Sequence, residues 1–557
     1  MSLVSQSMGP VPSETERIAK ASFPKGAPLV ILRDELGPLF QDEEFSDLYS
    51  WKGAEGISPA HLATVTVLQY VEGLSDRQAA HMMRGRIDWK YLLGVPLDYA
   101  GFDYSVLSEF RSRLLSADAT ERLFEIPLAK MKTYGLVRSR GRQRSDSTHV
   151  LAAVATLNRI ELVGETLRYT LNQIAIVAPQ WLSSWTPEAW FERYHVRIEE
   201  AKLPTSKHAR EELVQNIGQD GFRLLDAIAQ ADAPEYIHSL PVIEILQRVW
   251  REQFIRIQDD DSDSNWRVEW RPAEEMSPSE EMINSPYDPN AHFSRKGKTT
   301  WVGYKAHLTE SCDDDLPHII THVETTPANQ PDDQTLGTIH DALAEKGLLP
   351  AEHLIDSGYV DVENVLDSQQ LGVEVVGPMR PNTSWQAKAQ TGYDIAHFVI
   401  DWEAQEVTCP QGNVSCLFSP STDKHGVETI TARFPHHDCA ACPARELCTR
   451  AKSGPRGIRF QPQEKHETLQ QARREQQESS FRERYKKRAG VEGTISQSTR
   501  SFGMRRTRYI GDAKTRLQHL AIASAVNISR LAGWFMNIPH SITRVSAFAE
   551  LAPFPVC

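Results

Sequence analysis

Three acidic residues lie far apart in the chain, each within a short motif. Asp146 lies in RSDSTHV, Asp356 in LIDSGYV and Glu492 in AGVEGTIS. Hard divalent ions such as Mg²⁺ prefer carboxylate oxygens, and a few acids suffice because Mg²⁺ keeps several waters. Phosphoryl transfer commonly uses two such ions about 3.5–4 Å apart. One such acid alone would be interpreted as a surface residue, but the three together indicate a two-metal site. The small neighbours that leave room for a substrate backbone are Ser147, Ser357, Gly358 and Gly493.

A second candidate site is a cluster of cysteines. Five of the seven cysteines lie between positions 409 and 448, whereas Cys312 and Cys557 are isolated. So few cysteines in 557 residues do not make a disulfide scaffold, and their clustering indicates metal. Four thiolates suit a structural, tetrahedral Zn²⁺ site. The expected ligands are Cys409, Cys439, Cys442 and Cys448, with Cys416, His436 and His437 as alternatives. The other interpretation is a set of reduced cysteines in a small β-rich insertion.

The segments around the acids alternate between strand and helix patterns. Strands are predicted at 142–153, 301–310, 317–326, 353–360 and 373–378, and the second and third form a hairpin. Helices are predicted for DDQTLGTIHDALAEKG, for VENVLDSQQLG and over 481–503. This is the element order of an RNase H-like domain, in which the first and fourth strands lie side by side. Asp146 and Asp356 would then share a metal, and Glu492 on the last helix would close the site.

Helical patterns flank this core. ISPAHLATVTVLQYVEGL follows a Ser58-Pro59 pair suited to a helix start, and Ser75 precedes DRQAAHMMRG. Short helices with tight turns fit either a helix-turn-helix-like DNA reader or a compact bundle without that function. A run of helix formers extends to IEILQRVWREQFIRIQ, and an acidic segment poor in apolar residues follows it.

The predicted fold class is therefore α/β, with a mixed sheet flanked by helices, an all-α N-terminal domain, a helical insertion and a small Cys-rich insertion. The expected organisation is a loosely ordered segment (1–40), the helical N-terminal domain (41–118), a catalytic core (130–153 and 291–380), the helical insertion (154–257), an acidic flexible linker (258–290), the Cys-rich insertion (381–470) and the C-terminal part of the core (471–540).

Charge is segregated along the chain. The net charge is −13, but residues 130–144 hold six lysines and arginines and no acid, and residues 481–516 hold eleven against three acids. Each run is next to a candidate catalytic acid, and local basic surfaces decide whether phosphates are attracted. No apolar stretch approaches the length of a membrane span, and the N-terminus has no secretory pattern, so we expect a cytoplasmic protein without membrane contact.

The motifs together resemble bacterial insertion-sequence transposases of the DDE type with an InsH-like N-terminal domain, over about residues 40–536. DWKYLLGVPLDYAGFDYSVLSEFRSRL resembles that domain. GYKAHLTE, ETTPANQPD, TCPQG and RAGVEGTISQSTRSFGMRRTRYIGDAKTRLQ, with the motifs of the acids, resemble the catalytic part. The resemblance implies a catalytic triad of Asp146, Asp356 and Glu492. Tyr485, Arg488 and Glu492 match a Tyr-Arg-Glu-Lys signature of related transposases, but position 499, where the lysine is expected, is threonine, and Arg500 stands beside it.

What the resemblance implies is a DNA transposase that binds terminal inverted repeats, hydrolyses the transposon ends and transfers the freed 3′-hydroxyl to target DNA. Two Mg²⁺ (or Mn²⁺) ions per active site, a homodimer on the DNA ends and a nucleoid-associated location are part of this expectation. The residues expected to contact DNA are Tyr485, Arg488, Arg500, Arg505, Arg506, Arg508 and Lys514. The alternatives are an inactive DNA-binding derivative and a nuclease without strand transfer. We expect His149 and His307 to be structural or phosphate-contacting, and Trp301 and Trp402 to belong to the core.

Overall fold

The centre of the chain is a mixed β-sheet built from the strands that the sequence predicts. The computed structural model describes residues 3, 8–50, 52–199, 202–258, 266–422 and 426–538. Within them the sheet has the strand order β6-β5-β1-β7-β8, and a further strand, β4, also pairs with β5. The strands are β1 (Arg142–Leu151), β4 (His292–Lys296), β5 (Thr299–Ser311), β6 (Ile320–Pro327), β7 (Glu352–Leu354) and β8 (Glu374–Val376). The expected neighbours, the first and fourth predicted strands, are confirmed as β1 and β7, which pair in parallel.

The long pairing of β1 with β5 depends on one glycine. The two strands run antiparallel from Gln143 opposite Ser311 to Leu151 opposite Gly303. At Gly303 the φ angle is +151°, and a Cβ there would lie 2.2 Å from the carbonyl oxygen of Val150. Only glycine allows the two backbones to approach this closely.

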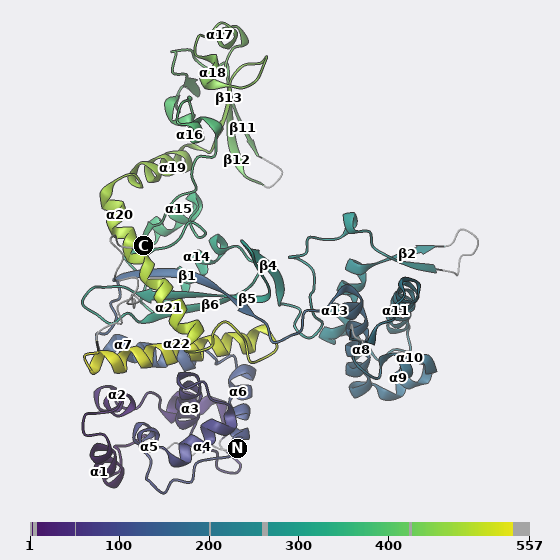
Figure 1. Cartoon of the computed structure of the whole chain (residues 1–557), viewed down its shortest axis with the longest axis vertical. Coiled ribbons are helices and arrows are strands. Elements are labelled where there is room, and N and C mark those ends of the chain that lie inside the picture. The colour runs from purple at the N-terminus through teal and green to yellow at the C-terminus, as the bar shows by residue number, and fades with distance from the viewer. Residues whose placement is uncertain are drawn as a thin grey trace, which may run out of the picture.

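Helices cover the sheet, and one of them joins it to the N-terminal helices. Helix α14 (Leu336–Glu345) follows β6, and α15 (Val362–Gln370) follows β7. Helix α21 (Gly490–Arg500), which carries Glu492, comes later in the chain. The long helix α22 (Asp512–Phe535) is buried through most of its length. It lies between β6 and the N-terminal helices, as Figure 1 shows, and a single apolar core extends through all of them.

The described residues of the N-terminal part form seven α-helices and a short 3-10 helix (Asp42–Leu48), and α1 to α5 lie at the bottom of Figure 1. The α-helices are α1 (Ser13–Ser22), α2 (Pro28–Leu36), α3 (Pro59–Val71), α4 (Asp76–Gly85), α5 (Ile87–Leu93), α6 (Ser105–Ser116) and α7 (Arg122–Thr133). Ser58 and Ser75 cap α3 and α4 as expected, and Ser75 forms a capping box with Gln78. The expectation of a loosely ordered segment over 1–40 is wrong for residues 13–36. Helix α2 buries Leu29, Leu32 and Leu36 and packs on α5 and α22, while α1 packs on α5, and this packing outweighs the scattered prolines and glycines.

A helical region with its own apolar core projects to one side of the sheet (Figure 1). It contains α8 (Arg159–Val177), α9 (Pro179–Trp185), α10 (Glu188–Tyr194), α11 (Lys207–Ile228), α12 (Glu235–His238) and α13 (Pro241–Gln253). The helix predicted to extend through FIRIQ is wrong at this end of the region. These residues form strand β2 (Phe254–Gln258), which pairs with β3 (Trp266–Trp270).

The acidic linker predicted over 258–290 is also structured where it is described. The ring of Trp270 stacks on that of Phe254 at 4.9 Å, and Ile283, Ser285 and Asp288 are buried. Aromatic stacking and burial of these few side chains order a segment whose composition alone predicts flexibility. Residues 259–265 of this linker lie outside the described residues.

The cysteine-rich segment projects from the end of the molecule opposite the N-terminal helices, at the top of Figure 1. It is built around a small core of its own. Its elements are α16 (Trp385–Ala389), β9 (Val399–Asp401), β10 (Glu406–Thr408), β11 (Leu417–Thr422), β12 (Glu428–Arg433), α17 (His436–Ala440), α18 (Arg445–Cys448) and β13 (Gly457–Phe460). Helices α19 (Gln463–Glu475) and α20 (Ser479–Lys486) lead back to the sheet. No helix in the described part of the chain is long and apolar enough to cross a membrane.

Candidate active site

The three predicted acids come from three elements and converge on one arginine. Asp146 lies within β1, Asp356 follows β7, and Glu492 is in the first turn of α21. The guanidinium of Arg488 lies 2.8 Å from Asp146 Oδ2, 3.8 Å from Asp356 Oδ2 and 3.7 Å from Glu492 Oε1. Because β1 and β7 run in parallel, the aspartates reach the same end of the sheet. Residues more than 300 positions apart in the sequence thus surround a single positive charge.

The acids differ in their surroundings. Asp146 is almost buried, and burial raises its pKa; Arg488 opposes that shift, whereas the charge of Asp356 adds to it. Its Oδ1 accepts a hydrogen bond from the amide of Ser147 at 2.8 Å. Asp356 Oδ1 accepts one from the amide of Gly358, also at 2.8 Å. Glu492 is exposed for 69% of its side chain, so it is the member of the set most free to change rotamer.

These side chains fit a hard cation in chemistry, although not in their present arrangement. Among the side chains that the structure describes, no three His, Cys, Asp or Glu residues form a group that holds a metal ion as they stand. The place between the carboxylates is taken by the guanidinium of Arg488, a cation that all three face. A set of oxygen donors around a positive charge is the set that Mg²⁺ or Mn²⁺ requires.

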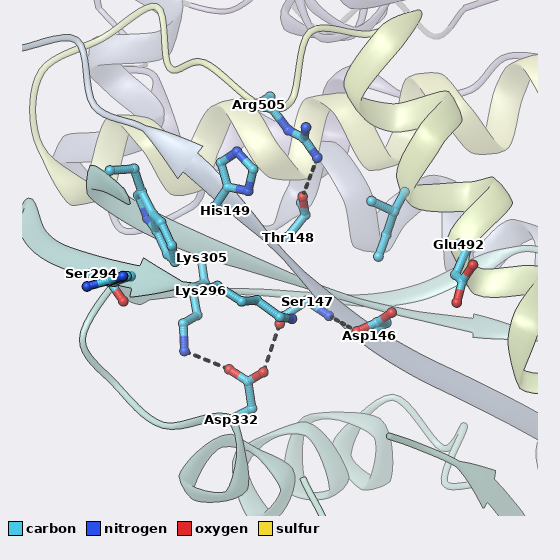
Figure 2. A pocket seen from close by; sticks show the side chains of 13 residues that line it. Asp146, Ser147, Thr148, His149, Ser294, Lys296, Lys305, Asp332, Glu492 and Arg505 are labelled. Atoms are coloured by element: carbon cyan, nitrogen blue, oxygen red, sulfur yellow. Dashed lines mark hydrogen bonds and ion pairs between the residues drawn. The ribbon is translucent and has the colours of Figure 1, made fainter. Parts of the chain in front are cut away.

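A cavity of about 430 Å³ opens beside the acids, and Figure 2 shows the side chains around it. Asp146 and Glu492 lie at one end. Within it, Asp332 Oδ2 accepts a hydrogen bond from Ser147 Oγ at 2.9 Å, and its Oδ1 lies 2.8 Å from Lys305 Nζ. Burial alone would raise the pKa of Asp332, but the charge that His307 carries at acidic pH, together with Lys305 and the Ser147 hydroxyl, outweighs burial and lowers it.

Lys305 and Asp332 are site residues that the sequence analysis missed. Both lie in motifs that carry the family resemblance, GYKAHLTE and ETTPANQPD, and that is the signal that would have found them. The ion pair between Lys305 and Asp332 connects β5 to the short 3-10 helix before α14. Asp332 also accepts a hydrogen bond from Ser147, the neighbour of Asp146, and lies below Ser147 in Figure 2. The ion pair fixes the wall of the cavity on the side opposite α21.

A buried ionic cluster fastens α21, the helix that carries Glu492, to the sheet. Glu310 on β5 is fully buried between the guanidinium groups of Arg144 (2.7 Å) and Arg530 (2.6 Å). Thr494, two residues beyond Glu492, donates to Glu310 Oε2 at 2.5 Å. Burial alone would raise the pKa of Glu310, but the attraction of Arg530 and Arg144 and the Thr494 hydrogen bond outweigh it, so the pKa is lowered. The charge is therefore retained in the core.

The residues expected to contact DNA are divided among three places. Arg488 lies among the acids, and Tyr485 packs beside them, stacked on Phe481 at 5.7 Å. Arg505 lines the cavity and donates to Thr148 Oγ1 at 3.2 Å, with Arg506 next to it at the end of β1. The remaining three lie apart from the cavity: Arg500 in a separate groove with Arg144 and Arg530, Arg508 over the ring of Tyr70 on α3, and Lys514 exposed near the start of α22.

The two histidines and two tryptophans lie as structural residues do. His307 is buried and bonded to Thr326, and burial lowers its pKa to about 4, so its ring is neutral. The ring of His149 lies against Trp301, which is 5% exposed, at the cavity wall. Trp402 packs among Phe418 and Phe460 in the cysteine-rich segment.

The four cysteines expected to bind zinc line one small cavity. Burial raises the pKa of the Cys448 thiol, Arg456 opposes this shift, and the other three thiols add to it. The proposed substitutes lie elsewhere: Cys416 is exposed beside the carbonyl of Arg433, and His437 is exposed beside Asp438. None of the six described cysteines forms a disulfide, and Cys557 lies outside the described residues.

Comparison with protein families places two parts of the chain. Residues 408–532 match the family described as Transposase DDE domain, and residues 17–113 match the Transposase domain family (DUF772). The first span contains Glu492 and the cysteine cluster, and the second covers the N-terminal helices from α1 to α6. The two matches are consistent with a DDE-type insertion-sequence transposase, and they confirm the resemblance on which the sequence analysis relied. No curated protein matches the chain.

Proposed function

We propose that this protein is the DNA transposase of an insertion sequence, which binds terminal inverted repeats and catalyses metal-dependent strand cleavage and strand transfer. One observation carries the proposal. Carboxylates from β1, from the segment after β7 and from α21 lie within 4 Å of the same guanidinium, beside an open cavity.

The sheet supports an RNase H-like interpretation of the catalytic core. Its order, β6-β5-β1-β7-β8, has three antiparallel strands followed by two parallel ones, with helices α14 and α15 in the connections. The helical region between β1 and β4 and the cysteine-rich segment between β8 and α21 are then insertions into that core. Apart from the segments 1–40 and 258–290, which were corrected above, the predicted domain boundaries are part of this proposal.

Asp146, Asp356 and Glu492 would hold two Mg²⁺ or Mn²⁺ ions. When bound, such ions lower the pKa of an attacking water or hydroxyl and stabilise the leaving oxygen of the phosphodiester. Asp146 is oriented by the Ser147 amide and Asp356 by the Gly358 amide, so both aspartates are fixed before DNA arrives. The exposed Glu492 completes the set from the opposite wall.

Arg488 has a second role in this scheme. Its guanidinium neutralises the acids while the protein is free, and it withdraws toward a DNA phosphate when substrate and ions enter. An arginine fork pairs with phosphate oxygens as readily as with carboxylates. Arg505 and Arg506, together with the exposed Arg500, Arg508 and Lys514, would follow the DNA backbone, and Tyr485 would support Arg488 from α20.

The remaining features complete the proposal. Cys409, Cys439, Cys442 and Cys448 would hold one structural Zn²⁺ ion, since they share one cavity and four thiolates suit that ion. The N-terminal helices would read the end sequence in a helix-turn-helix-like manner. Two copies would join two transposon ends as a dimer, in the cytoplasm and associated with the nucleoid.

The test uses purified protein with a duplex that carries the inverted repeat flanking its gene. With Mg²⁺ we expect cleavage at the end and joining of the 3′-hydroxyl to a target plasmid. Asp146→Asn, Asp356→Asn and Glu492→Gln should each abolish cleavage and retain end binding, while Glu345→Gln on the exposed face of α14 should cut normally. Cleavage without joining would replace the proposal with a nuclease, and binding without cleavage would replace it with an inactive derivative.

A further inference from the structure

The wall of the cavity opposite the acids is a basic β-hairpin. Strands β4 and β5 pair from His292 opposite Gly303 to Lys296 opposite Thr299, which leaves Gly297 and Lys298 as a two-residue turn. Gly297 has a φ of +63° at the first central position, where a type II′ turn has glycine. The hairpin is therefore a regular extension of the sheet rather than an irregular loop.

The tip of this hairpin carries three exposed cations, Arg295, Lys296 and Lys298. Arg295 and Lys296 line the same cavity as Asp146 and Glu492, and Arg505 lines it from the other side. Figure 2 places Lys296 and Arg505 on the two sides of the β1 segment that carries Asp146. Within the described part of the chain, none of these four cations forms an ion pair with a carboxylate. They contrast with Lys305 in the same cavity, which is paired with Asp332.

The charges in the cavity are therefore arranged in sequence: acids at one end and unpaired cations at the other. A phosphodiester at the acids has neighbouring phosphates one nucleotide away on either side. Exposed cations at that position neutralise phosphates without reading the bases.

We infer that the β4–β5 hairpin binds the sugar–phosphate backbone of DNA directly next to the phosphate that is cut, with Arg505 on the opposite side of the strand. This inference rests on the proposed function and adds to it a DNA-contacting element outside the segment 485–514. A solvated hairpin without a ligand would leave these side chains at the surface in the same numbers, but it gives no reason for them to line the same cavity as the acids.

Binding measured against salt tests the inference. The probe is a labelled duplex with the end sequence, studied without added Mg²⁺ or Mn²⁺ so that no strand is cut. The variant is Arg295→Gln/Lys296→Gln/Lys298→Gln. The matched control removes three exposed cations from the helical region, Lys202→Gln/Lys207→Gln/Arg267→Gln.

Each phosphate contact contributes about 0.9 to the slope of log affinity against log salt. Loss of three contacts should make the slope of the hairpin variant shallower by about 2.7, so that between 50 and 200 mM salt its affinity falls about 40-fold less than that of the wild type. The control should keep the wild-type slope. Because the altered side chains are exposed, the thermal unfolding midpoint should not change.

A second measurement locates the contact. Replacing single phosphates near the cut site by neutral methylphosphonates should weaken the wild type at one or two positions and leave the hairpin variant unaffected there. The inference is overturned if the hairpin variant keeps the wild-type salt slope, if the control loses as much, or if the methylphosphonate effects persist in the variant. None of these outcomes depends on cleavage, so failure of the proposed triad would be seen separately, as undiminished cutting by Asp146→Asn.

Discussion

The buried carboxylate of Glu310 offers the sharpest test of how the site is held. The change Glu310→Gln keeps the shape of the side chain and removes the charge that Arg144 and Arg530 share. Removing one partner of a buried ion pair costs about 3–5 kcal/mol, because the other charge is left without compensation. Here two guanidinium groups lose the negative charge between them, and one of the two carboxylate oxygens that accept from Arg144, Arg530 and Thr494 is replaced by an amide donor, so the upper part of that range is expected.

The loss should appear first as local opening of α21. Hydrogen exchange of its amides reports that free energy directly. At about 1.4 kcal/mol for each factor of ten, 3–5 kcal/mol corresponds to about 150- to 4000-fold faster exchange. Glu492 is carried by the same helix, so cleavage should fall as well, while end binding is retained.

The pH dependence of this effect has a definite sign. The folded-state pKa of Glu310 is lowered from its ordinary value of 4.5, so its ionised form stabilises the folded protein. That contribution is complete above pH 4.5 and is lost as the pH falls through the folded-state pKa. The difference in exchange rate between wild type and Glu310→Gln should therefore shrink below pH 4.5. Glu345→Gln, on the exposed face of α14, is the control. Exchange in α21 within about threefold of wild type, with normal cleavage, would refute this account of the cluster; a threefold change is less than about 1 kcal/mol.

Two further predictions concern metal and backbone. Metal analysis of reduced, freshly purified protein should find about one zinc per chain. Cys439→Ser should remove the zinc and Cys416→Ser should keep it, because of these two residues only Cys439 lines the shared cavity. Wild-type protein without zinc would contradict the prediction and leave the cysteines as an ordinary reduced cluster. Gly303→Ala should unfold or strongly destabilise the sheet, by about 3 kcal/mol or more, because its Cβ meets the carbonyl oxygen of Val150 at 2.2 Å and the amide nitrogen of Ala152 at 2.6 Å. Position 297 also has a positive φ, but a Cβ there meets open space, so Gly297→Ala should lower the free energy of unfolding in chemical denaturation by only about 1–2 kcal/mol. Equal losses of stability for the two variants would contradict the steric argument.

Periodicity and capping residues predicted much of the fold. The five strands β1, β5, β6, β7 and β8 lie where strand-forming residues, turns and the order of the elements indicated them, and Ser58 and Ser75 begin helices as their hydrogen-bonding chemistry requires. The motifs around the three acids also led to residues that the structure brings together. Local patterns are sufficient for the strands and the helix caps, because the side chains that decide them act within their own element.

The errors occurred where distant parts of the chain decide the outcome. The helices of residues 13–36 are stabilised by packing on α5 and α22, and β2 and β3 depend on the stacking of Phe254 with Trp270. The β4–β5 hairpin was overlooked although Gly297-Lys298 between two strand-forming segments carries its turn signal. Arg488 was predicted to contact DNA, and its signature places it near Glu492, but no local pattern indicates that its guanidinium also lies close to Asp146 and Asp356.

Helix α22 has a consequence for the order in which the molecule can be completed. The N-terminal helices contact this helix through α2, α3 and α7, and it is the final element of the described chain. During synthesis the N-terminal helices leave the ribosome first, but α22, which lies at the centre of the largest apolar core, is complete only once residue 535 has been added. The part that would recognise the DNA ends and the part that would cut them mature together, so a truncated chain should provide neither a partial binder nor a partial nuclease.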